Sequence, residues 1–204
     1  MLRVFLVRHG ITVWNREARW QGHTDVPLSE EGIKQAEQAS HRLKSEDIRA
    51  VWSSDLKRAA VTADLIAKPH GLEVQTSLAL RETMLGDWEG LTIPELIARG
   101  DEDTWLAMKN GSMNHRPPNS EPLEEMWNRI VEQFHLIKSG HDEGAIVIVG
   151  HGGSLRAILC DALGAGLPSL TRFQLENASI STLDFNEHRS WVKSVNVTCH
   201  LKPL

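Results

Sequence analysis

Two histidines stand at matched points of the sequence. His9 closely follows the apolar stretch 3–7, His151 closely follows the apolar, β-branched stretch 145–149, and a glycine comes after each histidine. Such stretches are typical of buried strands, and in open α/β sheets ligands bind beyond the carboxyl ends of the strands. Both imidazoles are therefore expected to face one cleft, where the glycines let the backbone and a ligand approach closely.

Two arginines accompany these histidines. Arg8 directly precedes His9, and Arg58 falls in the first turn of a helix that is expected after another strand. The formal net charge of the chain is −5, so these residues would form a local basic pocket in an acidic protein. Because a guanidinium group matches the oxygens of a phosphoryl group, the combination predicts a phosphate site.

Catalysis at such a site would need a nucleophile and a proton carrier. One ring nitrogen of His9 can attack phosphorus if a hydrogen bond to the other nitrogen fixes the tautomer. The leaving oxygen then needs a proton, and Glu82 is a candidate because it follows a short apolar run and precedes a glycine-containing loop. From the residues alone, Asp87 and Glu89 compete with Glu82 for this role.

Alternating strand and helix patterns surround these residues and predict an α/β fold. We expect three layers, α/β/α, around a central sheet that is mostly parallel and has an antiparallel edge. The expected strands cover residues 3–7, 50–54, 72–76, 145–149, 179–185 and 191–198, the last two forming a hairpin. The expected helices cover residues 30–43, 56–66, 92–109, 122–138 and 154–163. Ser29 and Asp55 are expected to cap the first two helices, and Gly100 to interrupt the third.

The overall composition is that of an ordinary globular domain. The 204 residues are 41% hydrophobic and 24% charged, which predicts a single domain over residues 1–204. The stretch at about 92–122 is expected to be an insertion or lid over the sheet edge. Its last part, residues 110–122, is rich in Gly, Pro, Asn and Ser and is expected to be a loop.

Charge and cysteine content argue against several function classes. A mildly acidic chain is a poor general binder of nucleic acid, which requires a basic surface. Cys160 and Cys199 lack metal-ligand spacing, so neither a metal site nor a disulfide is predicted. No apolar run approaches the ~18 residues of a membrane span, and the N-terminus lacks the pattern of a signal peptide. We therefore expect a cytoplasmic protein without a membrane partner.

Five ordered blocks resemble the signature of the histidine phosphatase superfamily, which includes the cofactor-dependent phosphoglycerate mutases. The blocks are LVRHG at 6–10 with Thr12, Trp14 and Asn15; RWQG at 19–22 with DVPLSEEG at 25–32; SSDLKRA at 53–59; Glu82 with GDWEG at 86–90; and VGHGG at 149–153. The resemblance covers nearly the whole chain in one collinear order. It implies the phosphoglycerate mutase-like fold.

The resemblance also implies a role for each matching residue. His9 would be the phosphorylated nucleophile, and Glu82 would be the proton donor and then the base that activates water. Arg8, Arg58 and His151 would hold the phosphoryl oxygens. The arginines and a charged His151 would supply the positive field, so no metal and no cofactor is implied. The positions that line the phosphate pocket are matched by Asn15, Gln21, Gly22 and Gly152.

The residues after Glu82 distinguish two kinds of enzyme in this superfamily. The mutases have an Arg-His-Tyr-Gly type block there, whereas residues 83–90 resemble the phosphatase branches, which include α-ribazole-phosphate and phosphoserine phosphatases. We therefore expect a metal-independent phosphoric monoester hydrolase of the histidine acid phosphatase type, branch 1. A phosphoglycerate mutase and a catalytically inactive phosphate-binding protein are the alternatives.

The substrate is expected to be a small phosphorylated metabolite. Because loops commonly determine specificity, we expect His115 and Arg116, with Trp105 and Met108, on the leaving-group side of the pocket. The oligomeric state is left open by the sequence, a homodimer included.

Overall fold

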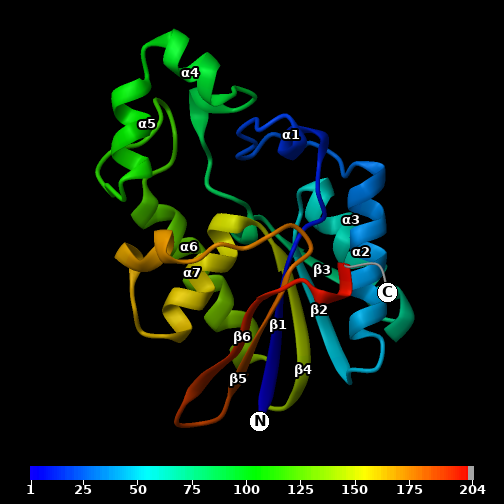
Figure 1. The fold of residues 1–204 in the computed structure, drawn as a ribbon. Coiled ribbons are helices and arrows are strands. Elements are labelled where there is room, and N and C mark those ends of the chain that lie inside the picture. The colour runs from blue at the N-terminus through cyan, green and yellow to red at the C-terminus, as the bar shows by residue number, and fades with distance from the viewer. Residues whose placement is uncertain (202–204) are drawn as a thin grey trace.

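The computed structural model describes residues 1–201, so the last three residues of the predicted domain lie outside the described part. Six strands form one sheet in the order β3-β2-β4-β1-β5-β6 (Figure 1). The strands are β1 (Leu2–Arg8), β2 (Ile48–Ser54), β3 (Val74–Ser77), β4 (Gly144–Gly150), β5 (Ile180–Phe185) and β6 (Ser190–Val197). The first four pair in parallel, and β5 is antiparallel to both β1 and β6. The predicted parallel sheet with an antiparallel edge and a terminal hairpin is confirmed.

The central strands are apolar on both faces because helices cover both faces. Along β1 and β4, alternate side chains belong to different cores: Leu6 and Ile148 to one, Val7 and Val149 to the other. Such a strand reads as an unbroken apolar run rather than an alternating one, since neither face meets water. This is why the stretches 3–7 and 145–149 were recognisable from the sequence.

Two pairs of helices form the outer layers. Helices α2 (Glu30–Leu43) and α3 (Lys57–Ala67) cover one face of the sheet, through residues such as Leu43 and Ile66. Helices α6 (Leu123–Ser139) and α7 (Gly152–Ala162) cover the other, with Phe134 and Ile158 in its core. The predicted three-layer α/β/α arrangement is therefore confirmed (Figure 1).

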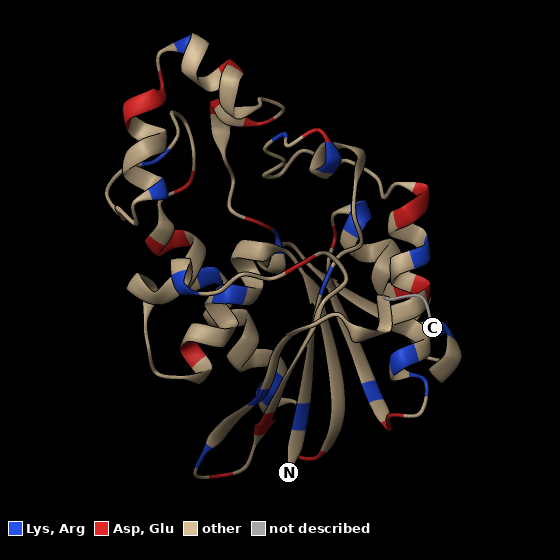
Figure 2. Cartoon of the chain, viewed as in Figure 1, with Lys and Arg blue, Asp and Glu red and all other residues tan. Residues whose placement is uncertain are grey.

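Helix α2 illustrates how the sequence specifies one of these layers. The Ser29 side chain accepts a hydrogen bond from the Gly32 amide (3.1 Å), as expected of an N-cap. Basic and acidic residues alternate along the exposed side of this helix (Figure 2). The helix thus presents an apolar stripe to the sheet and a mixed-charge face to solvent.

Three short helices stand beyond the carboxyl ends of the strands. They are α1 (Val13–Arg16), α4 (Ile93–Arg99) and α5 (Glu102–Lys109). Gly100 separates α4 from α5 with a left-handed backbone (φ 94°), which confirms the predicted interruption. The α4–α5 unit has a small core of its own around Trp88 and Leu96, against which Trp105 packs. Residues 111–122 form turns and irregular structure, as predicted.

The predicted capping role of Asp55 is wrong. Helix α3 begins at Lys57 with Leu56 as its N-cap, and the carboxylate that accepts from the Lys57 amide is that of Asp25 (2.8 Å). The Asp55 carboxylate instead accepts two hydrogen bonds from Arg81 (2.8 and 2.5 Å). A bidentate pair with a guanidinium satisfies a carboxylate better than one amide does, and it ties the end of β2 to the segment that carries Glu82. No helix among residues 1–201 is both long enough and apolar enough to cross a membrane.

Candidate active site

A cleft of about 980 Å³ lies at the carboxyl ends of the parallel strands. Its lining includes all five residues expected to be catalytic, which are Arg8, His9, Arg58, Glu82 and His151. Basic segments from β1 and the start of α3 meet at this end of the sheet (Figure 2). The expectation that both imidazoles face one cleft, with Arg8 and Arg58 beside them, therefore agrees with the geometry.

The pairing of β1 with β4 brings the two histidines together. The strands are parallel and in register, so that Arg8 lies opposite Gly150, and the His9 amide donates to the Gly150 carbonyl (3.0 Å). The next residue of each strand end is a histidine, and the two ring centroids lie 5.1 Å apart. Register between two neighbouring strands is thus what places the imidazoles side by side.

His9 is held in the tautomer that a nucleophile needs. Its Nδ1 lies 2.7 Å from the Gly10 carbonyl oxygen, which can only accept, so Nδ1 carries the proton and Nε2 keeps its lone pair. The ring is buried (3% exposed). Burial, with help from the positive charges of Arg58 and Arg8, holds the pKa of His9 well below its usual value of 6.5. His9 is therefore neutral at physiological pH.

His151 presents an unused donor next to His9. Its Nδ1 accepts from the Arg58 Nε (3.3 Å), so its Nε2 carries the proton. This Nε2 is buried and has no hydrogen-bond partner in the described part of the chain. A buried donor without a partner costs free energy, and an anion at this point would satisfy it.

The charged His151 implied by the family resemblance does not fit the site as it stands. Burial, and after it the positive charges of Arg58 and Arg8, lower the pKa of His151 well below 6.5. A ring in a dry pocket beside a guanidinium cannot easily take a second proton. The positive field of this site therefore comes from Arg8 and Arg58, and His151 contributes a neutral hydrogen-bond donor.

The two arginines are anchored by backbone carbonyls rather than by carboxylates. Arg58 is 1% exposed and donates to the carbonyls of Thr24 (2.8 Å) and Gly22 (2.7 Å). Burial lowers its pKa to about 10, which still leaves it charged at neutral pH. Arg8 donates from Nη1 to the Leu175 carbonyl (2.5 Å), while its buried Nε has no partner within residues 1–201. No carboxylate in the described part of the chain forms an ion pair with either guanidinium, so the two fixed charges attract an anion strongly.

Glu82 enters the cleft from a loop after β3. Its two carboxylate oxygens each lie 3.0 Å from the Gly153 amide, and one accepts from the Thr83 amide (2.9 Å). A side chain at Gly153 would collide with Glu82, since a Cβ there would lie 2.1 Å from the carboxylate. The last glycine of the GHGG block, Gly153, is therefore needed to seat this carboxylate at the N-terminus of α7.

The two competing carboxylates have other partners. Glu89 accepts from the amides of His23 (2.9 Å) and Thr24 (2.9 Å), so it holds the loop that carries Gln21 and Gly22. Asp87 is exposed and bonded to Arg99 (2.7 Å) and Asn119 (2.9 Å). Neither Asp87 nor Glu89 lines the cleft, and the geometry therefore favours Glu82 as the proton carrier.

Four residues expected to bind phosphate line the cleft, namely Asn15, Gln21, Gly22 and Gly152. The side-chain oxygens of two of them are occupied, because Asn15 Oδ1 accepts from the Thr12 amide (3.0 Å) and Gln21 Oε1 accepts from the Thr12 hydroxyl (3.0 Å). This leaves each amide nitrogen free to donate. Thr12 thus orients two donors for one anion.

His115 and Arg116 do not line the cleft, although the loop position made them candidates. The exposed His115 ring bonds to Ser112 (2.8 Å), and Arg116 donates to the Ser120 carbonyl (2.5 Å). A turn from Pro117 to Ser120 folds this loop back on itself, and both side chains have hydrogen-bond partners within the loop. Trp105 and Met108, also expected on the leaving-group side, do line the cleft.

Two polar residues of the site, Asn177 and Arg156, lie outside the motif blocks. Asn177 donates to the His9 carbonyl (3.1 Å) and lies 3.3 Å from the Asn15 side-chain oxygen, and nothing near it in the sequence marks it. Arg156 lines the cleft from α7, and its Nε donates to the Gly152 carbonyl (2.8 Å). The sequence could have indicated Arg156, because it follows the motif residue Gly152 by four positions, and residues four apart lie on one face of a helix.

A clamp formed by Arg129 and Glu121 holds the backbone behind Glu82. From α6, Arg129 donates to the carbonyls of Arg81 (2.9 Å) and Glu82 (2.8 Å) and pairs with Glu121 (2.6 Å). Glu121 in turn accepts from the Met84 amide (2.7 Å). A loop of irregular backbone is thereby fixed from both sides of Glu82.

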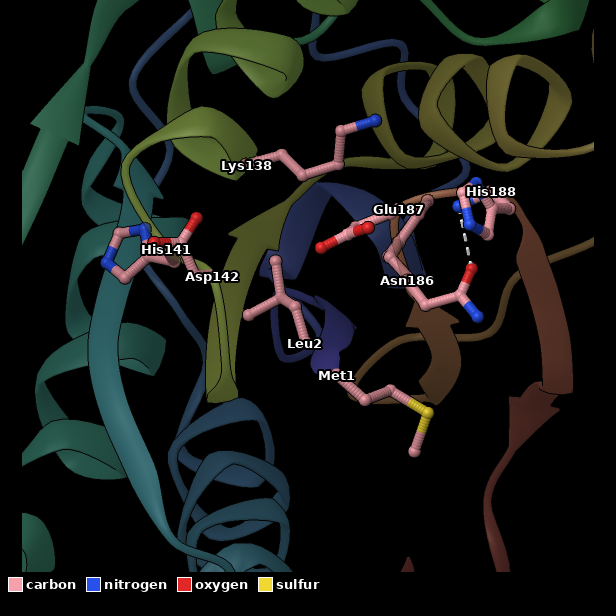
Figure 3. A pocket seen from close by; sticks show the side chains of 9 residues that line it. Met1, Leu2, Lys138, His141, Asp142, Asn186, Glu187 and His188 are labelled. Atoms are coloured by element: carbon pink, nitrogen blue, oxygen red, sulfur yellow. Dashed lines mark hydrogen bonds between the residues drawn. The ribbon is translucent and has the colours of Figure 1, made fainter.

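A second hollow, of about 710 Å³, lies at the other end of the sheet (Figure 3). Its lining combines charges of both signs, such as Lys138 and Glu187, with the apolar Leu2. The Lys138 ammonium lies 5.0 Å from the Phe185 ring centroid. This hollow contains none of the motif residues. Over residues 1–201 there is also no group of three or more His, Cys, Asp or Glu side chains placed to hold a metal ion.

Known proteins resemble this chain over its whole length. The family model described as histidine phosphatase superfamily (branch 1) matches residues 4–198. Phosphoserine phosphatase 1 of Hydrogenobacter thermophilus is 32% identical over 203 residues, 98% of this chain and 95% of that protein. A probable phosphoglycerate mutase, GpmB of Yersinia pestis, is 35% identical over 207 residues, with the same two coverages. The crystal structure of a phosphoserine phosphatase mutant from Entamoeba histolytica, in complex with phosphoserine, has a TM-score of 0.86 at 28% identity, covering 99% of this chain and 100% of that one.

Proposed function

The chain belongs to the histidine phosphatase superfamily, branch 1, and from that premise we propose that it hydrolyses small phosphate monoesters through a phosphohistidine on His9. One observation carries the proposal. A neutral His9 with Nε2 unprotonated stands beside two buried donors, Arg8 Nε and His151 Nε2, for which residues 1–201 provide no hydrogen-bond partner. That arrangement offers an attacking lone pair and a ready seat for phosphoryl oxygens.

In the first step, His9 Nε2 attacks phosphorus and the bond from phosphorus to the leaving oxygen breaks. Arg8, Arg58 and His151 hold the phosphoryl oxygens, and the N-terminus of α7 adds its partial positive charge. Glu82, in its protonated form, transfers its proton to the leaving oxygen. The alcohol departs, and the phosphoryl group stays on His9.

In the second step, water attacks the phosphohistidine. The Glu82 carboxylate now accepts a proton from that water, the nitrogen–phosphorus bond breaks, and His9 keeps the electron pair. Inorganic phosphate leaves, and Glu82 is again protonated for the next turnover. Because Glu82 acts in both steps, the hydrogen bond from the Gly153 amide that fixes its position supports both proton transfers.

Arginine charge in place of a metal is part of the proposal. Arg8 and Arg58 can neutralise a phosphate monoester dianion without an added cation. The test is hydrolysis of p-nitrophenyl phosphate with and without excess EDTA. The His188→Ala variant, which lacks an exposed histidine outside the cleft, is assayed alongside the wild type as a control. Activity that is lost in EDTA and restored by a divalent metal would contradict this part of the proposal.

A phosphoglycerate mutase is the second candidate, and the relative named as a probable mutase is the observation that favours it. A mutase would return the phosphoryl group from His9 to a bound phosphoglycerate before water reached it. Residues 83–90 lack the Arg-His-Tyr-Gly type block of the mutases, which favours the phosphatase. Conversion of 3-phosphoglycerate to 2-phosphoglycerate, faster than phosphate release, would decide for the mutase. Convergence of His9, Glu82 and both arginines argues against an inactive phosphate-binding protein.

A further inference from the structure

Arg156 places a positive charge in the cleft that the proposed phosphoryl chemistry does not use. It lies on α7, one turn after Gly152, and is half-buried in the cleft wall. Its Nε is occupied by the Gly152 carbonyl (2.8 Å), which directs the guanidinium back toward the helix N-terminus. Its two terminal nitrogens form no hydrogen bond or ion pair with any residue from 1 to 201, so they remain available to a ligand.

The charges of the cleft show what Arg156 could bind. Arg8 and Arg58 together match the two negative charges of a phosphate monoester. Arg19 also lines the cleft, but Glu17 (2.9 Å) and Glu95 (2.8 Å) neutralise it. Lys109 lines the cleft as well, with its ammonium 5.0 Å from the Trp105 ring centroid, but a lysine offers a point charge and no fork of donors. Arg156 therefore remains as a fork of donors for a further anion.

The position of Arg156 assigns this anion to the leaving group. Gly152 lies between Glu82 and Arg8, since a Cβ built on it would be 3.7 Å from the Glu82 carboxylate and 3.9 Å from the Arg8 guanidinium. The leaving oxygen must come within reach of Glu82, so atoms beyond that oxygen extend along the wall that carries Arg156. The wall continues with the apolar side chains of Leu170 and Phe173, and Glu176 further along the same segment is an anion, so a ligand carboxylate there would be drawn to Arg156.

We propose that Arg156 binds a carboxylate on the alcohol part of the substrate, which makes the substrate a phosphorylated hydroxy acid. The inference rests on the proposed phosphatase function and extends it to a substrate class. A guanidinium fork pairs with a carboxylate through two parallel hydrogen bonds, so it gives orientation as well as affinity. Phosphoserine and phosphoglycerate, which appear in the names of the two relatives described above, are both carboxylate-bearing phosphate esters.

Two pairs of substrates test this directly, because the members of each pair differ at the carboxylate. They are phosphoserine with phosphoethanolamine, and 3-phosphoglycerate with glycerol 3-phosphate. The wild-type protein should prefer the carboxylated member of at least one pair in kcat/KM. Arg156→Gln should then lower kcat/KM for that member by roughly 10- to 100-fold, the value of a charged hydrogen-bonded contact. The kcat/KM for the member without the carboxylate, and for p-nitrophenyl phosphate, should change by less than about threefold.

Three controls keep the result specific. Arg156→Lys keeps the positive charge but not the two parallel donors, so its kcat/KM for the carboxylated substrate should fall less than that of Arg156→Gln. Arg172→Gln removes an exposed arginine that does not line the cleft, and it should leave the preference unchanged. Binding of the same pairs to His9→Ala, measured by calorimetry with and without Arg156→Gln, gives a readout that needs no turnover.

The outcomes separate this inference from the proposed function. Equal losses for both members of a pair, or a wild-type protein that hydrolyses p-nitrophenyl phosphate without preferring a carboxylated ester, would overturn the role of Arg156. A wild-type protein inactive on p-nitrophenyl phosphate would contradict the phosphatase. In that case, binding to His9→Ala would still decide on the carboxylate.

Discussion

The imidazole rings of His9 and His151 lie with their centroids 5.1 Å apart and their planes tilted by 58°. Both rings are buried, and both face the charges of Arg8 and Arg58. Their pKa values are lowered together, first by burial and then by these charges. One ring therefore keeps a nucleophilic lone pair while the other keeps a proton to donate, and neither needs a carboxylate partner.

This relationship predicts how stability depends on pH. Below pH 6.5 the unfolded histidines take up protons, whereas the folded ones resist until their lowered pKa values are reached. Stability rises with pH wherever the unfolded state binds more protons, so acidification should destabilise the protein, by up to about 1.4 kcal/mol per pH unit for each ring. Urea unfolding at pH 7.5 and 5.5 measures this. Between the two pH values, the free energy of unfolding of His151→Gln should fall by about 1–2 kcal/mol less than that of the wild type. An equal fall in both proteins would refute the lowered pKa of His151.

The nucleophile can be identified by trapping the phosphoenzyme. His9→Ala should abolish both turnover and protein labelling, because the phosphoryl group would have no acceptor. The measurement is an acid quench with an activated aryl phosphate, followed by detection of acid-labile, base-stable phosphate on the protein. His188→Ala serves as the control and should label normally. Full labelling of His9→Ala would exclude the central step of the proposed mechanism.

Glu82 should separate substrates by their leaving groups. General acid catalysis contributes ~10²–10⁴-fold, and a poor alkoxide leaving group needs it far more than nitrophenolate does. Glu82→Gln should therefore lose much of this factor on an alkyl phosphate and less in phosphorylation by p-nitrophenyl phosphate. Phosphoenzyme should also accumulate with the aryl ester, since water activation is impaired. Similar losses on both esters, without accumulation, would assign Glu82 a structural role.

The clamp of Arg129 and Glu121 should affect proton transfer by Glu82 indirectly, by holding the backbone that carries it. Arg129→Met removes donors to the Arg81 and Glu82 carbonyls and leaves Glu121 without its cation. We expect a loss of about 1–3 kcal/mol in the free energy of unfolding, because partly buried groups lose their partners. In the folded variant, kcat should fall more for an alkyl than for an aryl phosphate. Arg49→Gln, which breaks only an exposed pair with Asp47, is the control. A loss of stability with an unchanged ratio of the two rates would mean that the clamp supports the fold alone.

Substrate ranking should respond to Trp105 rather than to the loop beyond it. Trp105 lines the cleft, whereas His115 and Arg116 do not line it and bond to Ser112 and Ser120. Trp105→Ala should change the order of kcat/KM among alkyl phosphates more than it changes activity on p-nitrophenyl phosphate. His115→Ala should leave the order unaltered. A reversed pattern would mean that the 110–122 loop closes over the substrate during turnover.

The local pattern of the sequence was sufficient for the elements and for the motif residues. Apolar runs covered on both faces identify β1 and β4, and whatever follows such a strand must emerge at its carboxyl end. His9 and His151 could be placed in one cleft on that basis, without knowing the register. The identity of the elements and the location of the site are thus consequences of short-range patterning.

Only the tertiary structure determined the charge states and hydrogen-bond partners that depend on distant residues being buried together. The neutral state of His151 follows from its burial beside Arg58, 93 positions away, and no pattern around His151 indicates it. Asn177 reaches the His9 carbonyl across 168 positions. The partners of Asp55 and Arg116 likewise depended on how loops packed, because a polar side chain takes the best donor or acceptor that the fold brings within reach. Charge state and hydrogen-bond partnership are properties of an environment, and the chain creates that environment only by folding.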